Sequence, residues 1–143
     1  MLPRTRIELP ADLKDLAYRT LGAAYRVHTR LGPGLRESHY RRCLMHALRQ
    51  DGIGAVENAP IDLEFEGLEL PRALLIDILV EDTIVLELKA RSQRDPVWDS
   101  QILSYIEHAR KPLGYVVNFH SVHLRKGIRP MINRPLFEKG DDA

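Results

Sequence analysis

The strongest constraint on this chain is a largely apolar segment, residues 74–90, that carries ionisable side chains in its interior. Asp77 lies within Leu-Leu-Ile-Asp-Ile-Leu-Val, while Glu87 and Lys89 lie within Ile-Val-Leu-Glu-Leu-Lys. Short apolar runs of this kind predict core strands. Charged side chains in such strands are costly to desolvate unless they are paired or bind a metal. The segment therefore predicts a sheet core with a compensated set of charges built into it.

The same segment predicts a β-hairpin. With a three-residue turn over residues 81–83, Asp77 falls opposite Glu87, because the two lie equally far from the turn. A turn one residue shorter would shift the pairing by one and still leave the acids close. Side chains alternate along a strand, so Glu87 and Lys89 share one face. Two acids and a lysine are therefore expected to converge.

These residue types indicate a particular chemistry. Two neighbouring carboxylates repel each other, and a divalent cation removes that repulsion. Mg²⁺ takes oxygen ligands and keeps several waters, which suits Asp77 and Glu87. Lys89 can orient or help deprotonate a water at such a metal and offset charge on a phosphate. The set indicates phosphodiester hydrolysis, and the alternative from spacing alone is a structural ion pair of Lys89 with one of the acids.

Two amphipathic helices are expected before the hairpin. Apolar residues recur at three-and-four spacing over residues 13–31, and Gly-Pro-Gly at residues 32–34 ends that helix. A second pattern of this kind covers residues 40–48 and stops near Asp51-Gly52. Cys43 falls in this second stripe and is expected to pack inside.

The remaining pattern predicts strands around a third helix. Period-two alternation over residues 55–90, broken near residues 58–60, 66–67 and 81–83, predicts three or four strands. Asp95 can cap a helix that has Pro96 in its first turn and runs to residue 109. Further strands are expected over residues 115–119, 122–124 and 128–131. The order predicts one α/β domain, residues 1–133, with a mixed sheet flanked by helices and a flexible tail over residues 134–143.

Composition bounds the function classes. A chain of 143 residues with 44% hydrophobic content fits one domain with one core. Its formal net charge of +1 gives no reason by itself to expect nucleic acid, so such a claim must rest on local clusters. The single cysteine cannot form an internal disulfide, and charges and prolines interrupt the N-terminal residues, so a cytoplasmic location is expected. Acids interrupt the most apolar stretch too often for a membrane span.

A further motif lies ahead of the acids. Residues 34–40 carry a G-x-x-E-x-x-Y pattern, and Gln-Ile-Leu-Ser-Tyr at residues 101–105 and Val-Asn-Phe at residues 117–119 follow the lysine. Together and in this order the motifs resemble the bacterial GxxExxY family, which is grouped with the PD-(D/E)XK nuclease superfamily and is largely uncharacterised biochemically. The resemblance covers about residues 16–131. It implies a restriction-endonuclease-like mixed sheet flanked by helices.

The resemblance also implies a metal site. It puts Asp77 and Glu87 at the metal-binding acids, with the Leu88 carbonyl as a further ligand, and Lys89 at the catalytic lysine. Glu37 matches the helix glutamate that such nucleases often add to the metal shell, directly or through water. Its alternative role is an acid that favours the helix dipole. The implied activity is Mg²⁺-dependent hydrolysis of DNA, with RNA as the second choice of substrate. Mn²⁺ can substitute for Mg²⁺.

Other residues are expected around that site. Gln101 matches the helix motif and is suited to hold a water or a phosphate oxygen. Tyr40 and Tyr105 are candidates for substrate contact, with core packing as the alternative. Arg91 and Arg94 follow the lysine directly and are candidates for phosphate contact, with solvated surface as the alternative.

Three functions compete at this stage. Beside the nuclease stand a nucleic-acid- or protein-binding module that retains the nuclease fold with little chemistry, and a purely structural homodimer subunit. A homodimer is also compatible with the nuclease, because small nucleases often dimerise to cut two strands. Zinc is not expected, because spacings such as Cys43-x-x-His46 do not supply four paired ligands.

Overall fold

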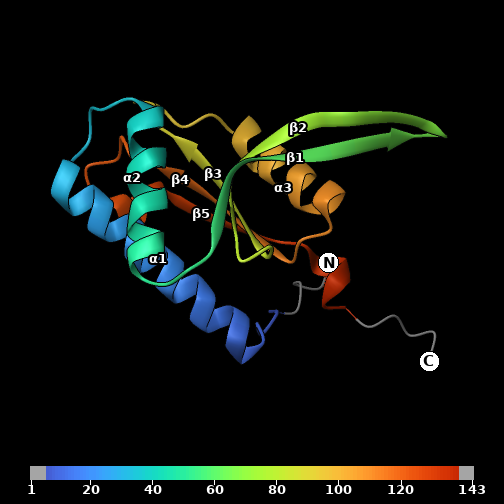
Figure 1. The fold of residues 1–143 in the computed structure, drawn as a ribbon, viewed down its shortest axis with the longest axis horizontal. Helices are drawn as coiled ribbons and strands as arrows, with labels where there is room; N and C mark the ends of the chain where they lie inside the picture. Colours follow the sequence, from blue (N-terminus) through green and yellow to red (C-terminus); the bar gives the residue numbers. More distant parts are fainter. Residues whose placement is uncertain (1–5, 139–143) are drawn as a thin grey trace.

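A mixed five-stranded sheet in the order β1-β2-β3-β4-β5 forms the centre of the fold (Figure 1). The structure, a computed structural model, describes residues 6–138. The strands are β1 (Ala55–Phe65), β2 (Leu68–Val80), β3 (Ile84–Lys89), β4 (Leu113–Asn118) and β5 (Ile128–Ile132). Strands β3 and β4 are parallel and all other neighbours are antiparallel. The one parallel pair requires a crossover, which the third helix provides.

Helices cover both faces of this sheet. They are α1 (Ala11–Leu31), α2 (Glu37–Gln50) and α3 (Val97–Ala109), with short 3₁₀ helices η1 (Leu124–Gly127) and η2 (Arg134–Leu136). Helices α1 and α2 lie on one face and α3 on the other (Figure 1). The predicted α/β fold, with two N-terminal helices, a hairpin, a third helix and further strands, is confirmed. None of the helices among residues 6–138 combines the length and apolar character needed to cross a membrane.

Strand β3 is buried on both faces, and this places the charged residues. Ile84, Leu86 and Leu88 pack in the α1–α2 core, whereas Val85 packs in the α3 core beside Ile102. Because side chains alternate, Glu87 and Lys89 follow Val85 onto the α3 face.

The predicted hairpin register is confirmed. Val80 pairs with Ile84, and the ladder continues to the pair of Ile78 with Leu86. The Thr83 amide donates a 2.8 Å hydrogen bond to the Val80 carbonyl, closing a turn whose two central residues have φ of 48° and 52°. Positive φ at both positions matches the twist of the flanking strands.

Two strand predictions were wrong. Residues 58–60 do not end a strand but lie inside β1. Pro60 is tolerated there because β1 is an edge strand, where a missing amide donor breaks no interior ladder. Residues 122–124 form no strand, because the chain must turn between β4 and the antiparallel β5, and it does so through η1.

The helix ends and the tail show smaller differences. Helix α3 begins at Val97, whose amide donates a 3.0 Å hydrogen bond to the predicted cap, Asp95. Cys43 is exposed instead of packed, since it lies off the edge of the buried stripe of α2. The expected tail opens with η2, and Phe137 packs against the α1–α2 core, while residues 139–143 lie outside the described residues.

The β1–β2 hairpin extends as an arm beyond the other strands (Figure 1). Its register shifts between Ile61 and Leu63, and its outer part carries exposed Phe65, Leu68 and Leu70. The inner part of the arm packs against α3 through Ile61, on the same face of the sheet as Val85.

We expect the packing of α3 on the sheet to make Gly114 irreplaceable. A Cβ at Gly114 would stand 2.8 Å from Ile106 Cγ2 and 2.9 Å from Ile102 Cδ1, and both isoleucines are fully buried. Gly114→Ala should lower the free energy of unfolding by about 1–3 kcal/mol in urea denaturation. Gly22→Ala, at an exposed position of α1 with nothing within 4 Å, should raise it by up to about 1 kcal/mol. Equal stability of both variants would contradict this packing.

Candidate active site

Asp77 on β2 and Glu87 on β3 meet where the ladder between their strands stops. The Leu88 amide donates a 2.8 Å hydrogen bond to Asp77 Oδ2, and the Asp77 amide donates a 3.2 Å hydrogen bond to Glu87 Oε1. Regular pairing of the two strands ends just before, at Ile78 and Leu86. Each carboxylate thus accepts from the backbone of the opposite strand. The structure brings together the two acids that the hairpin register placed opposite each other.

Both acids hold their negative charge at a cost. Glu87 is only 3% exposed, and burial, followed by repulsion from Asp77, raises its pKa to about 8. Burial also raises the pKa of half-buried Asp77, while the Leu88 amide and Lys89 oppose that rise. The pair therefore does not readily carry two negative charges without a cation nearby.

Lys89 is held from α3. Its Nζ donates a 3.0 Å hydrogen bond to Gln101 Oε1 and stands 5.6 Å from the centroid of the Trp98 ring. Gln101 Nε2 donates in turn to the Tyr105 hydroxyl at 3.3 Å. Among the ion pairs of the described residues, none joins Lys89 to either acid within 4.0 Å. The purely structural ion pair considered from spacing alone is thus not what the geometry shows.

Glu37 approaches the same place from the first turn of α2. Burial raises its pKa, with Asp77 adding to the rise and Lys89 opposing it, so Glu37 lies within electrostatic reach of both. Within residues 6–138, however, no three His, Cys, Asp or Glu side chains form a cluster that could hold a metal. Glu37 therefore stands beside the Asp77–Glu87 pair and does not close a tight ligand set with it.

The two tyrosines differ. Tyr105 is half-buried, and repulsion from Glu87 and Asp77 contributes to its raised pKa after burial, so it borders the acids. Tyr40 is fully buried and stacks on Phe119 with ring centroids 4.5 Å apart. Its hydroxyl donates to the Gly32 carbonyl at 2.5 Å. This position does not fit the expected substrate contact: Tyr40 fixes the loop that leads into α2.

Arg91 extends the site past Lys89. Asn118 holds its backbone, accepting from the Arg91 amide at 3.1 Å and donating to the Arg91 carbonyl at 3.0 Å. The Arg91 side chain is exposed, and its charge acts on the pKa of Glu37. Arg91 is thus near the acids and open to solvent.

Arg94 is more constrained. It forms an ion pair with Asp99, which also pairs with Arg129 at 2.9 Å, and it lies 5.9 Å from the Trp98 ring centroid. Hydrogen bonds from Arg94, with a smaller contribution from Arg129, lower the pKa of Asp99. Residues 90–96, Trp98 and His120 line a groove of about 660 Å³. This groove adjoins Lys89 and presents mainly polar and basic groups.

Sequence reasoning assigned no role to two residues of the site, Arg41 and Asn118, although Asn118 lies in the Val-Asn-Phe motif. Arg41 was not singled out from the sequence, yet its charge lowers the pKa of both Glu37 and Asp77. Its separation of four residues from Glu37 on one helix was a usable signal. Asn118 pairs with Lys89 at the end of the parallel strands, and recognising that parallel pairing would have placed it here.

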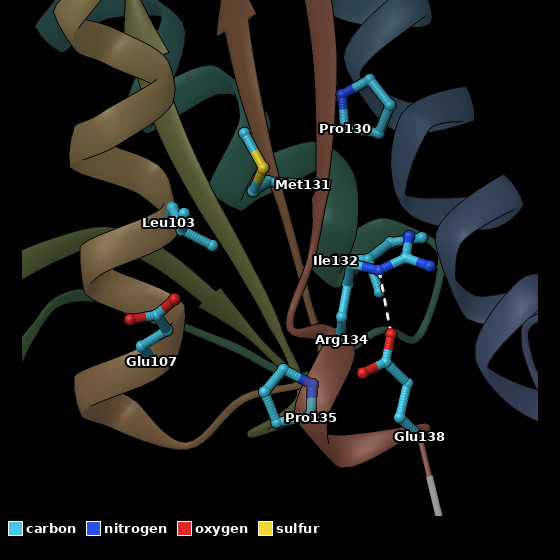
Figure 2. A pocket seen from close by; sticks show the side chains of 8 residues that line it. All are labelled: Leu103, Glu107, Pro130, Met131, Ile132, Arg134, Pro135 and Glu138. Carbon is cyan, nitrogen blue, oxygen red and sulfur yellow. Dashed lines mark hydrogen bonds and ion pairs between the residues drawn. The ribbon is translucent and has the colours of Figure 1, made fainter. Parts of the chain in front are cut away.

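A second cavity lies away from the acids (Figure 2). It is formed between α3, β5 and η2, and an Arg134–Glu138 ion pair at 3.1 Å crosses one side. None of the predicted site residues lines it. Its shape therefore says nothing about the Asp77–Glu87 pair.

The donors present fit a hard divalent cation. Asp77 and Glu87 offer carboxylate oxygens, and the burial of both, together with the repulsion that Asp77 exerts on Glu87, favours a positive ion between them. Such an ion would convert the cost of the buried negative charges into binding energy.

We expect the metal-free protein to lose stability as pH rises. A carboxyl whose pKa is higher when folded binds its proton more tightly when folded. The contribution of Glu87 to the stability of the fold is therefore fully present below pH 4.5, the ordinary pKa of a glutamate. It is lost as the pH rises through about 8, the pKa of Glu87 in the folded protein. Melting temperature in EDTA should fall by several degrees across this window, and Glu87→Gln should flatten the fall. The prediction fails if the wild-type protein and Glu87→Gln show the same slope.

Comparison with known proteins agrees with the motif order. The PD-(D/E)XK nuclease superfamily matches residues 14–131, which include both acids, Lys89 and all of α2, α3 and β4. No curated protein and no solved structure shows a significant match. Because the match spans most of the chain, this protein belongs to the PD-(D/E)XK nuclease superfamily.

Proposed function

We propose that this chain is a Mg²⁺-dependent nuclease of the GxxExxY type that hydrolyses phosphodiester bonds in DNA. The observation that carries the proposal is the Asp77–Glu87 pair with Lys89 on the same face, at the point where the β2–β3 ladder opens. Superfamily membership supports a nuclease-type activity. The choice of DNA over RNA rests on the resemblance alone, and the lone cysteine fits a cytoplasmic site of action.

The metal would be held by oxygen atoms from both strands. Asp77, Glu87 and the Leu88 carbonyl are the proposed ligands, and Glu37 adds an oxygen directly or through water from α2. Its position beside the pair favours the water-mediated contact. When bound, Mg²⁺, or Mn²⁺ in its place, supplies stabilisation of the negative charge that develops on the phosphate oxygens.

Lys89 is the proposed catalytic lysine. Its ammonium has three donors, of which one is used by Gln101, so the others remain for the attacking water and a phosphate oxygen. Water attacks phosphorus as the bond to the leaving 3′ oxygen breaks, so the products carry 5′-phosphate and 3′-hydroxyl ends. Gln101 keeps Lys89 in place, and Tyr105 supports Gln101 from the next turn of α3.

Substrate would follow the basic groove. Arg91 is open to solvent beside Lys89, whereas Arg94 is fixed by Asp99 and Trp98 as a preformed contact. Both are the proposed contacts to phosphates next to the scissile one. A homodimer that presents two such sites to two strands remains compatible with this proposal.

We expect cleavage to depend on the acids and the lysine. Purified protein incubated with plasmid, single-stranded DNA and RNA in Mg²⁺ or Mn²⁺ should cut DNA. Asp77→Asn and Lys89→Ala should lower the rate by roughly 10²–10³-fold, because each removes charge stabilisation of the transition state. Glu107→Gln, an exposed acid on α3 away from the pair, is the matched control and should keep the wild-type rate. Unchanged cleavage by Lys89→Ala would rule out the proposed assignment.

We also expect the metal to stabilise the fold. Mg²⁺ or Mn²⁺ should raise the melting temperature through linkage, with a larger rise at pH 8 than at pH 6, since binding requires deprotonated acids. Asp77→Asn should abolish the rise. A metal-independent melting temperature together with salt-dependent DNA binding and no cleavage would instead identify a binding module that retains the nuclease fold.

A further inference from the structure

Asn58 has an unusual backbone for a residue inside a strand. It lies within β1 yet has a φ of 55°, the left-handed region. Glu57 pairs with Ile78 and Ala59 pairs with Ile76, so the residue opposite Asn58 is Asp77. Asn58 and Asp77 themselves do not pair. The irregular residue of β1 therefore faces the proposed metal-binding acid across the strand boundary.

Strand β1 changes faces at Asn58. Ala55 packs against the α1–α2 core, whereas Ala59 and Ile61 belong to the α3 core. In a regular strand all three would share one face, because side chains alternate with period two. At Asn58 the backbone of β1 is thus rotated, so that the side chains after it point to the opposite face of the sheet from the one that alternation predicts.

Strand β2 changes faces at the same step. Val80 and Ile78 belong to the α1–α2 core, and Ile76 belongs to the α3 core. The switch therefore falls at Asp77. Since both strands rotate together, the pairs on either side of the step keep their register, and the arm beyond it lies against α3.

This rotation explains the contacts that Asp77 makes. If the β2–β3 ladder continued in the same register, Leu88 would lie opposite Ile76, and the Leu88 amide would donate to the main chain of β2. Instead it donates to Asp77 Oδ2, and the Asp77 amide donates to Glu87 Oε1. The carboxylate has taken the place of a main-chain acceptor.

We propose that Asn58 is a positioning residue, whose left-handed backbone turns β2 at Asp77 so that the two acids converge on one site. The inference rests on the proposed metal site. Asparagine tolerates positive φ better than most residues. Its side chain is exposed and forms no hydrogen bond within residues 6–138, so its conformation is what acts on Asp77.

The test compares substitutions that differ in their tolerance of positive φ. Glycine adopts it freely, alanine does so at some cost, and valine strongly resists it. Asn58→Val should weaken Mn²⁺ binding about tenfold by calorimetry without DNA, because the competent arrangement becomes a minor population. Asn58→Gly should bind Mn²⁺ within about twofold of wild type. The Mn²⁺ affinity of Asn58→Ala should lie between those of Asn58→Gly and Asn58→Val.

A matched control separates positioning from general strain. Arg72 on β2 has a φ of 54° and lies in the arm, away from Asp77. Arg72→Val should lower the melting temperature in EDTA as Asn58→Val does, yet leave Mn²⁺ affinity unchanged. A lower melting temperature with wild-type affinity in Asn58→Val, or equal loss of affinity in Arg72→Val, would overturn the inference.

A metal-free measurement keeps this inference separate from the proposed function. Because the Leu88 amide bonds to Asp77 Oδ2, its hydrogen-exchange protection in EDTA reports where that carboxylate points. Asn58→Val should reduce protection at Leu88 about tenfold relative to Leu86, and Asn58→Gly should preserve it. Wild-type protein that binds no Mn²⁺ would refute the metal site, while unchanged Leu88 protection in Asn58→Val would refute the positioning role.

Discussion

The buried contact between Asp77 and Glu87 is the interaction on which the rest of the site depends. A carboxylate as buried as Glu87 is unfavourable unless donors surround it. The Asp77 amide supplies one such donor, and the Leu88 amide does the same for Asp77. These amides are free to do so only because the ladder has opened. The end of the β2–β3 ladder therefore also creates the acidic site, because it frees the amides that bind the two carboxylates.

The surrounding elements follow from where that opening lies. The parallel neighbour of β3 ends with Asn118 beside Lys89, and Asn118 fixes the backbone that continues to Arg91. The crossover that parallel pairing demands brings α3, with Gln101, onto Lys89. Helix α2 begins with Glu37, which lies within electrostatic reach of Asp77 and Lys89. A parallel pair next to a hairpin thus gathers charged groups from distant parts of the chain.

Local rules explain what could be predicted from the sequence. Turn length set the hairpin register and hence put Asp77 opposite Glu87, and alternation set the face of Lys89. Helical spacing set the contact of Gln101 with Tyr105. All of these depend on residues close in sequence or across one tight turn.

What could not be predicted depends on tertiary arrangement. Pro60 fits inside β1 only because β1 is an edge strand, and no local pattern says which strand is at the edge. The burial of Tyr40 depends on Phe119, which is distant in sequence. Asn58 resembled a turn residue, and its backbone is indeed left-handed. The strand does not end there, however; only the face to which its side chains point changes. Residue type revealed the irregularity, and packing on two helical layers decided its form.

The arm also resolves an apparent conflict over charge. A net charge of +1 gives no general attraction to nucleic acid. Residues 61–73 of the arm, however, carry four acids and one arginine, so the remainder of the chain holds a net +4. Phosphates would be repelled by the arm and drawn to the groove beside Lys89, where Arg91 is exposed. Under the proposed function, this segregation of charge would let a nearly neutral chain attract a polyanion to the side of the groove and not to the arm.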